Sequence, residues 1–202
     1  MRCFIIGNGK SREGFDLTKL STHGKVFGCN ALYRDFKPEY NLPDYLIAID
    51  DKMIAEIDES DFPKDRFIEP REVEKFEDPR WNRFTQFRSN AGMNAMMEAY
   101  KMGFREMFCL GMDFIIDGDL TTSNMYAGTN AYGPETATSH GDSKRRCQYF
   151  NWFCRNYYDA KFRMVLPDPK EGQTIRINPI SARNCTGIFY AQLEEMITNA
   201  FV

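Results

Sequence analysis

The chain begins with a short apolar run that opens directly into a glycine turn. Residues Cys3 to Ile6 are apolar, and Gly7-Asn8-Gly9-Lys10-Ser11 follows them without a spacer. This order is typical of a buried strand that ends in a tight turn, where glycine lets the backbone take positive φ and approach a ligand closely. Such a turn can direct several N–H groups at one phosphate. It predicts an α/β fold with a nucleotide or nucleotide-sugar site at the end of the first strand. The residues expected there are Gly7, Asn8, Gly9 and Ser11.

The turn does not match either of the two common phosphate-binding patterns. No Gly-Lys-Ser/Thr follows a glycine at the spacing of a Walker loop. In a dinucleotide-binding fingerprint the third glycine would come earlier than Gly14, and the second strand would end in an acid rather than Asn30. The alternative interpretation is a strand-to-helix turn whose glycines serve packing alone.

Apolar runs alternate with helical patterns along the chain. Runs this apolar are typical of strands covered on both faces of a parallel sheet. The expected strands are Cys3–Ile6, Val26–Cys29, Tyr45–Ile49, Met107–Leu110 and Phe162–Leu166. The expected helices are Ala91–Met102, Ser143–Tyr158 and Gly187–Phe201. This alternation predicts a doubly wound, modified Rossmann-like α/β fold in one domain, residues 1–202.

Two segments interrupt the alternation. Asp58–Arg83 is charged and carries three prolines, so a loop-rich excursion is expected there. Asp117–Asp142 is rich in Gly, Thr, Asn and Ser and contains Tyr126 and Tyr132. A polar segment of that length in a compact domain is usually a lid or a binding loop.

Composition excludes several classes of protein. The net charge of −3 gives no strong attraction to nucleic acid or to a membrane surface. No run approaches the roughly 20 apolar residues of a spanning helix, and the start lacks the features of a signal peptide. The six cysteines form no C-x-x-C pair. They predict a reduced, cytoplasmic protein without a disulfide framework or a zinc site.

Polar side chains follow the predicted strands. Asn30 follows the second strand, Asp50 and Asp51 the third, and Asp113 the fourth. One such residue is usually a helix cap. Because parallel strands end at the same edge of a sheet, all four together predict a polar cleft.

Two further segments carry candidate residues. Arg88-Ser89-Asn90-Ala91-Gly92 precedes the Met-rich helix, so Ser89 or Asn90 is expected as its N-cap, and the helix start suits an anion. His140 precedes the next helix, where it is either a surface or capping residue or a general base. His23 lies in a turn and is taken as structural.

Acidic pairs raise the question of a metal. Asp117-Gly118-Asp119 resembles the Asp-x-Asp with which many glycosyltransferases hold a divalent ion, and Asp50-Asp51 could serve likewise. Short acidic pairs in loops are also common by chance, so the sequence assigns no metal ligand.

An ordered set of motifs, spread from Ile5 to Lys144, resembles the bacterial lipooligosaccharide sialyltransferases that use CMP-sialic acid. The matching segments are Ile5-Ile6-Gly7-Asn8-Gly9-x-Ser11, Val26-Phe27-x-Cys29-Asn30, Arg88-x-x-Ala91-Gly92, Gly103-Phe104, Phe108-Cys109-Leu110-Gly111-Met112-Asp113-Phe114, Ser139-His140 and Ser143-Lys144. The resemblance implies cytidine and phosphate contacts from Asn8, Gly9, Ser11, Asn30 and the helix start at Asn90–Gly92. It implies His140 as the catalytic base and requires no metal or other cofactor.

The chain departs from the family pattern at defined positions. Lys10 replaces a proline, Asn90-Ala91 replaces a Thr-Ser pair, Ile115 replaces a tyrosine, and Asp50 or Asp51 replaces an asparagine. The acids after the third strand suit a second family better. A similar glycine start and Gly-x-Asp segment occur in the hydroxymethylpterin pyrophosphokinases of archaeal type, which use Mg²⁺ and ATP.

The sequence therefore predicts transfer of a sugar from a CMP-activated donor to a hydroxyl of a glycan or small-molecule acceptor, with inversion. In this hypothesis His140 is the base, Arg88 lies near the leaving phosphate, and Tyr126 or Tyr132 donates a hydrogen bond to it. Asp50, Ser89 and Asp113 are expected to line the nucleotide site. The alternatives are metal-dependent pyrophosphoryl transfer and a nucleotide-binding module without catalysis. The aromatic-rich segments Tyr149–Tyr158 and Phe189–Tyr190 could supply a homo-oligomer interface.

Overall fold

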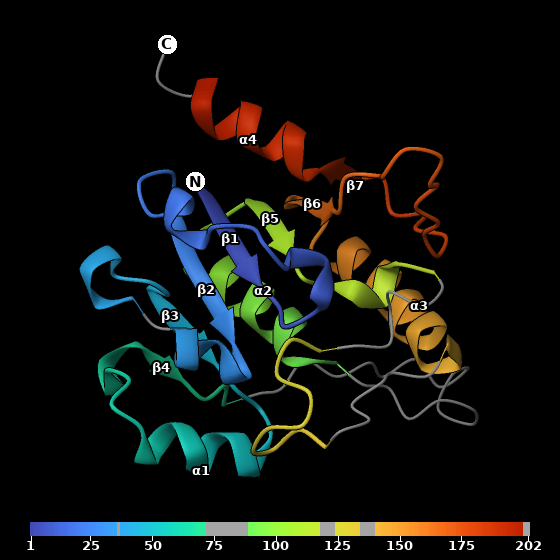
Figure 1. The fold of residues 1–202 in the computed structure, drawn as a ribbon. Helices are drawn as coiled ribbons and strands as arrows, with labels where there is room; N and C mark the ends of the chain where they lie inside the picture. The colour runs from blue at the N-terminus through green and yellow to red at the C-terminus, as the bar shows by residue number, and fades with distance from the viewer. Residues whose placement is uncertain (36, 72–88, 118–123, 134–139, 200–202) are drawn as a thin grey trace.

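The computed structural model describes residues 1–35, 37–71, 89–117, 124–133 and 140–199. Seven parallel strands in the described ranges form one sheet in the order β4-β3-β2-β1-β5-β6-β7 (Figure 1). The strands are β1 Arg2–Ile6, β2 Lys25–Cys29, β3 Tyr45–Ile47, β4 Phe67–Ile68, β5 Glu106–Leu110, β6 Lys161–Leu166 and β7 Cys185–Phe189. The α-helices are α1 Asp51–Glu59, α2 Ala91–Lys101, α3 His140–Asn156 and α4 Tyr190–Thr198. The 3₁₀ helices in the described ranges are η1 Lys10–Arg12, η2 Leu17–Leu20, η3 Asn30–Asp35, η4 Pro38–Tyr40, η5 Lys64–Arg66 and η6 Asp113–Ile115.

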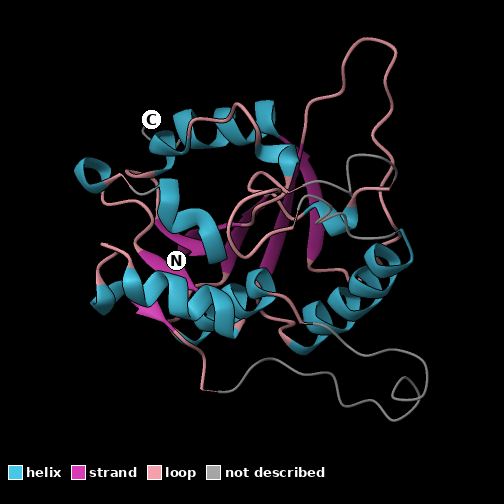
Figure 2. Ribbon diagram, turned by 60° about the horizontal axis from the view of Figure 1, so that its bottom comes forward, coloured by secondary structure: helices cyan, strands magenta, loops and turns pink. Residues whose placement is uncertain are grey.

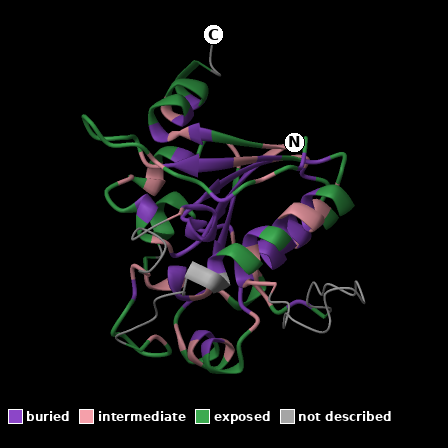
Figure 3. Ribbon diagram, turned by 90° about the vertical axis from the view of Figure 1, so that its right-hand side faces the viewer, coloured by how far each residue is buried: buried purple, intermediate pink, exposed green. Residues whose placement is uncertain are grey.

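Helices cover both faces of the sheet, so the predicted doubly wound, Rossmann-like fold is confirmed (Figure 2). Successive side chains of a strand point to opposite faces. On β1, Cys3 and Ile5 pack with α2 and α3, whereas Phe4 and Ile6 pack with α1 and α4. Strands β1, β2, β3, β5 and β6 are mostly buried, whereas the edge strands β4 and β7 are more exposed, and the helices expose their outer sides (Figure 3).

The order in which strands are added to the sheet reverses at β1. After β1 it adds β2, β3 and β4 on one side, and then returns to add β5, β6 and β7 on the other. All strands end at the same edge, which we call the carboxyl edge. Residues 124–133 of the predicted lid lie against this edge: Asn124 pairs with Gly9, and the Met125 amide donates to the Asn8 carbonyl at 2.9 Å.

Some predicted boundaries are wrong. The last helix begins at Tyr190, not at Gly187, because Gly187 and Phe189 pair with Met164 and Leu166 in a seventh strand. The third strand ends at Ile47 rather than Ile49. The excursion expected from Asp58 contains the end of α1 and the two-residue strand β4.

No helix in the described ranges combines the length and apolar character needed to cross a membrane. The six cysteines form no disulfide.

Candidate functional site

A pocket of about 580 Å³ opens at the carboxyl edge, beyond the ends of β2 and β3. Its volume lies within the range typical of small-molecule sites, roughly 300–1,000 Å³. Three segments form its walls: the β2–η3 junction, the start of α1, and the 124–133 segment. The lining residues are Asn30, Ile49, Asp50, Asp51, Lys52, Met53, Ala131 and Tyr132.

Asn30 is held in an unusual conformation at the pocket wall. Its φ is 49°, in the left-handed region, where asparagine is tolerated better than most residues. Its amide oxygen is buried and accepts no hydrogen bond from the described residues. Ala131, across the pocket, has φ 62°. Strained backbone of this kind is concentrated at binding and catalytic sites, so its occurrence at two wall positions favours a ligand site here.

Asp50 is the N-cap residue of α1, yet its carboxylate does not cap the helix. The amides of Met53 and Ile54 both donate to the Asp50 carbonyl oxygen, each at 2.9 Å. An N-cap aspartate normally accepts one of these amide hydrogens with its side chain. The Asp50 carboxylate therefore lies exposed at the pocket and does not bond to its own helix.

Asn8 and Tyr132 join the glycine turn to the pocket. The Asn8 side-chain N–H donates to the Cys29 carbonyl at 3.1 Å and to the Tyr132 hydroxyl at 3.3 Å. The Asn8 amide oxygen is buried without a hydrogen-bond partner among the described residues. Burial raises the pKa of Tyr132 and outweighs hydrogen bonds from the side chains of Asn8, Asn30 and Asn124. Tyr132 thus stays a neutral hydroxyl beside these three side-chain amides.

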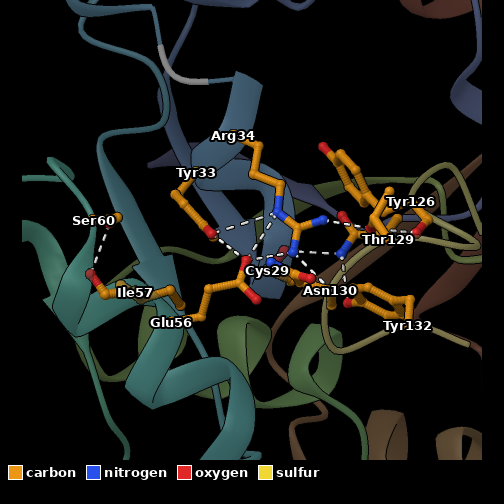
Figure 4. A network of polar contacts seen from close by, with 11 residues as sticks. Cys29, Tyr33, Arg34, Glu56, Ile57, Ser60, Tyr126, Thr129, Asn130 and Tyr132 are labelled. Atoms are coloured by element: carbon orange, nitrogen blue, oxygen red, sulfur yellow. Dashed lines mark hydrogen bonds and ion pairs between the residues drawn. The ribbon is translucent and has the colours of Figure 1, made fainter.

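Arg34, on η3, connects the three segments that form the pocket (Figure 4). Its Nε donates to Glu56 of α1 at 3.0 Å, and Nη2 also donates to Glu56. Its Nη1 donates to the Thr129 hydroxyl at 2.6 Å, and Nη2 to the Asn130 carbonyl at 2.9 Å. The Tyr33 hydroxyl completes the group by donating to Glu56. One guanidinium therefore connects α1, through Glu56, and the 124–133 segment to η3, which directly follows β2.

Tyr126 anchors the same segment at a second point. Its hydroxyl donates to Asp35 at 2.5 Å and accepts from Arg12 Nη2 at 3.0 Å. The Arg12 side chain is 4% exposed, and its Nε donates to the Gly7 carbonyl at 2.8 Å. Burial is the main cause of a strongly raised pKa of Tyr126. The Tyr126 hydroxyl is thus already engaged within the protein.

Hydrogen bonds within the protein occupy two amides of the glycine turn, those of Gly7 and Gly9. Gly7 N–H donates to the Leu110 carbonyl at 2.8 Å, and Gly9 N–H donates to the Gly111 carbonyl at 3.0 Å. A Cβ on Gly7 would lie 2.5 Å from the Gly111 oxygen, and one on Gly9 would lie 2.2 Å from the Asp113 carboxyl carbon. This geometry favours the packing interpretation for both glycines.

Ser11 and Asp113 form a buried pair beneath the turn. The Ser11 amide donates to Asp113 Oδ2 at 3.0 Å, and the Ser11 hydroxyl donates to Oδ1. Burial raises the pKa of Asp113 to about 6, although the bonds from Ser11 and the charge of Arg12 oppose this. Asp113 does not line the pocket with Asp50 and Asp51. The described residues contain no cluster of three or more His, Cys, Asp or Glu side chains suited to a metal ion.

The start of α2 is capped by Asn90, as predicted. The Asn90 side chain accepts from the Met93 amide at 2.9 Å, and Asn94 donates to the Ser89 hydroxyl at 2.8 Å. Ala91 and Gly92 are buried, and a Cβ on Gly92 would lie 2.6 Å from the Met112 sulfur.

The structure thus brings together Asn8, Asn30, Asp50 and Tyr132 among the predicted site residues. His140 is the first residue of α3, and Arg88 lies outside the described residues. The sequence analysis did not identify Arg34 or Glu56, because nothing in their local pattern distinguishes them from other surface charges.

Comparison of the chain with protein-family models, with curated proteins and with solved structures finds no match. Any assignment of function therefore rests on the site itself.

Proposed function

We propose that the pocket at the carboxyl edge binds a nucleotide sugar and that the protein transfers the sugar from a CMP-activated donor to an acceptor hydroxyl. The observation that carries this proposal is the convergence of Asn8, Asn30, Asp50 and Tyr132 at one edge of the sheet. Ligands of open α/β sheets bind outside the carboxyl ends of the strands. Asn8 and Asn30 belong to the motifs that resemble the sialyltransferases, whereas Asp50 is one of the two acids that stand in place of that family's asparagine.

In this proposal the bond between the anomeric carbon and the phosphate oxygen breaks, and CMP leaves with the electron pair. The acceptor oxygen attacks from the opposite face and gives its proton to His140. General-base help of this kind is typically worth about 10² to 10⁴ in rate. The start of α2 and Arg88 would stabilise the charge that develops on the leaving phosphate.

Ligand binding gives the first test. Binding to the folded state raises stability by mass action, so CMP should raise the melting temperature more than ATP or NAD. Each ligand is measured with and without Mg²⁺. A panel in which no cytidine nucleotide raises the melting temperature would contradict the proposal.

The two histidines of the chain give a matched pair for the catalytic step. His140→Ala should abolish sugar transfer and leave CMP binding intact, whereas His23→Ala should retain both. Full turnover by the His140 variant would remove that residue from the mechanism. Binding without transfer in the unaltered protein would instead support a nucleotide-binding module.

One observation favours metal-dependent pyrophosphoryl transfer as a second candidate: Asp50 and Asp51 both line the pocket. The third acid that this candidate needs, Asp113, has both carboxylate oxygens bonded to Ser11 instead. Activity that persists in excess EDTA would exclude the metal-dependent candidate.

A further inference from the structure

The two edges of the sheet differ in how they are protected. Strands β4 and β7 lie at its opposite ends (Figure 1). An edge strand presents unpaired N–H and C=O groups, and proteins usually protect it by making it short or by placing charged residues or proline there. Strand β4 has two residues and is flanked by Arg66 and by Glu69-Pro70. Strand β7, Cys185–Phe189, has five residues and contains neither a charge nor a proline. Strand β7 is therefore the unprotected edge.

The pairing with β6 determines which backbone groups of β7 point outward. Phe162 is the partner of Cys185 in the register, and its amide donates to the Asn184 carbonyl at 2.8 Å. Because alternate residues of a strand direct their backbone groups to the same side, residues 184, 186 and 188 face β6. Residues 185, 187 and 189 direct theirs away from the sheet.

The middle residue of the strand, Gly187, has the most open backbone. The outward N–H groups on either side of it are occupied: Cys185 N–H donates to the Ala182 carbonyl at 3.2 Å, and Phe189 N–H donates to Gln192 Oε1 at 2.9 Å. Gly187 directs both its N–H and its C=O outward, and neither has a partner among the described residues. One residue therefore offers a donor and an acceptor side by side at an exposed edge.

This arrangement fits the same strand of a second copy of the chain. When identical strands pair antiparallel about a twofold axis at Gly187, each Gly187 donates to the carbonyl of the other and accepts from its N–H. Thr186 then lies opposite Ile188 of the second copy, and Cys185 lies opposite Phe189. Cross-strand pairs of β-branched or apolar side chains stabilise a sheet. In the single chain Thr186 is exposed, and Cys185 and Phe189 are partly exposed.

Charges beyond the ends of β7 are complementary under the same axis. Arg183 is exposed, and the register continues it to a place opposite Ala191 of the second copy. The Ala191 amide donates to Asp168, which is also exposed, at 3.2 Å. The twofold axis therefore brings Arg183 of each copy close to Asp168 of the other, in two equivalent places.

We propose that the protein forms a twofold dimer in which β7 pairs antiparallel with β7 of a second copy, centred on Gly187. The two seven-stranded sheets then continue into one another. Strand β4 is protected at the far edge, so the assembly closes at two copies. The inference does not depend on the proposed function, because no residue of β7 lines the pocket.

The first test is sedimentation velocity of the full chain over a range of concentrations, with a reductant present so that free thiols do not cross-link. The unaltered protein should pass from monomer to dimer as the concentration rises. Gly187→Pro removes the outward N–H, and an edge strand tolerates proline where its N–H faces solvent. This variant should dimerise about 10-fold or more weakly. Gly187→Ala is the matched control, because it also adds a Cβ, 3.3 Å from Leu166 Cδ1, but keeps the N–H; it should dimerise like the unaltered protein.

Charge reversal tests the register without a change at Gly187. Arg183→Asp should weaken the dimer about 10-fold, because it places two acids together at each end of the paired strands. Adding Asp168→Arg to that variant should restore the affinity.

Three outcomes would overturn the proposal. The first is a protein that stays monomeric at every concentration. The second is a dimer that Gly187→Pro leaves as tight as Gly187→Ala does, since the interface would then lie elsewhere. The third is a double charge-reversed variant that dimerises no better than Arg183→Asp alone.

Discussion

Replacing Arg34 with alanine should destabilise the protein more than the loss of an ordinary surface ion pair. The Arg34 and Glu56 side chains are only 22% and 21% exposed. Truncation leaves the Glu56 carboxylate with the Tyr33 hydroxyl as its remaining partner among the contacts described above. Hydrogen bonds to a charged group are worth about 1.5–3 kcal/mol, and an unpaired charge adds its desolvation cost. Thr129 and Asn130 are exposed, so water replaces their lost bonds at little cost.

The expected loss is therefore about 2–3 kcal/mol in the free energy of unfolding. For a domain of this size, that corresponds to a melting temperature lower by roughly 5–10 °C. Urea unfolding gives the free energy, and calorimetry gives the melting temperature. Hydrogen exchange should also become faster at the amides of the 124–133 segment, which loses its bonds from Arg34 to Thr129 and Asn130.

Lys19→Ala is the matched control. Lys19 pairs with Glu194, but the two side chains are 50% and 45% exposed, and such exposed pairs contribute roughly 0–1 kcal/mol. A loss in Arg34→Ala no larger than in Lys19→Ala would refute the reasoning, as would unchanged exchange in residues 124–133.

The same pair gives a pH dependence with a definite sign. Burial alone would raise the pKa of Glu56, but hydrogen bonds from Tyr33 and Arg34 and the charge of Arg34 lower it below its ordinary value of 4.5. A carboxylate with a lowered pKa stabilises the folded state above the unfolded pKa and loses that effect as the pH falls through the folded value. The difference in stability between the unaltered protein and Arg34→Ala should therefore shrink below about pH 4.5.

Two further predictions concern the glycine turn. Gly9→Ala should lower the free energy of unfolding by about 1–3 kcal/mol, because the new Cβ overlaps the Asp113 carboxyl group. The control Gly133→Ala should be close to neutral, because no atom lies within 4 Å of its new Cβ. Equal losses of stability in urea unfolding of the two variants would contradict the packing role of Gly9. The Asp113→Asn variant removes a carboxyl group whose pKa is raised in the folded protein. Protonated Asp113 stabilises the folded state below its ordinary pKa of 3.8, and this stabilisation is lost as the pH rises through about 6. Between these pH values the unaltered protein should lose up to about 3 kcal/mol relative to the variant, and parallel pH profiles of unfolding free energy would contradict this.

The sequence is sufficient to predict most of the sheet because buried parallel strands are short, continuous apolar runs. Strands β1, β2, β5 and β6 lie within one residue of their predicted bounds. Strand β7 was not predicted, because residues 185, 186 and 187 are partly or fully exposed and the sequence there contains no apolar run. Strand β4 has two residues, which is too short for any periodic signal.

The site is predictable only where parallel geometry decides it. Asn30 and Asp50 line the same pocket because the strands before them end at the same edge of the sheet. Asp113 also follows a strand, yet its carboxylate turns beneath the glycine turn, where Ser11 supplies two donors. Whether a carboxylate after a strand faces the pocket or the interior depends on which hydrogen-bond donors lie within reach. The tertiary packing determines those donors. Arg34 is unpredictable for the same reason, since its partners lie 22 and 95 residues away along the chain.

The position of the pocket also has a physical explanation. Open α/β sheets usually bind their ligand where the chain reverses direction, which here is between β1 and β5. At that point the Gly7 amide bonds to the Leu110 carbonyl, and Gly7 and Gly111 pack so closely that a Cβ on either would overlap the other's carbonyl oxygen. The two strand ends therefore fill the crevice with their own backbone. The pocket lies instead beyond β2 and β3, where Arg34 bonds to both α1 and the 124–133 segment. The glycine turn is then connected to the pocket through Asn8, whose side chain bonds to Tyr132. Gly7 and Gly9 on either side of Asn8 allow the close packing that holds it there.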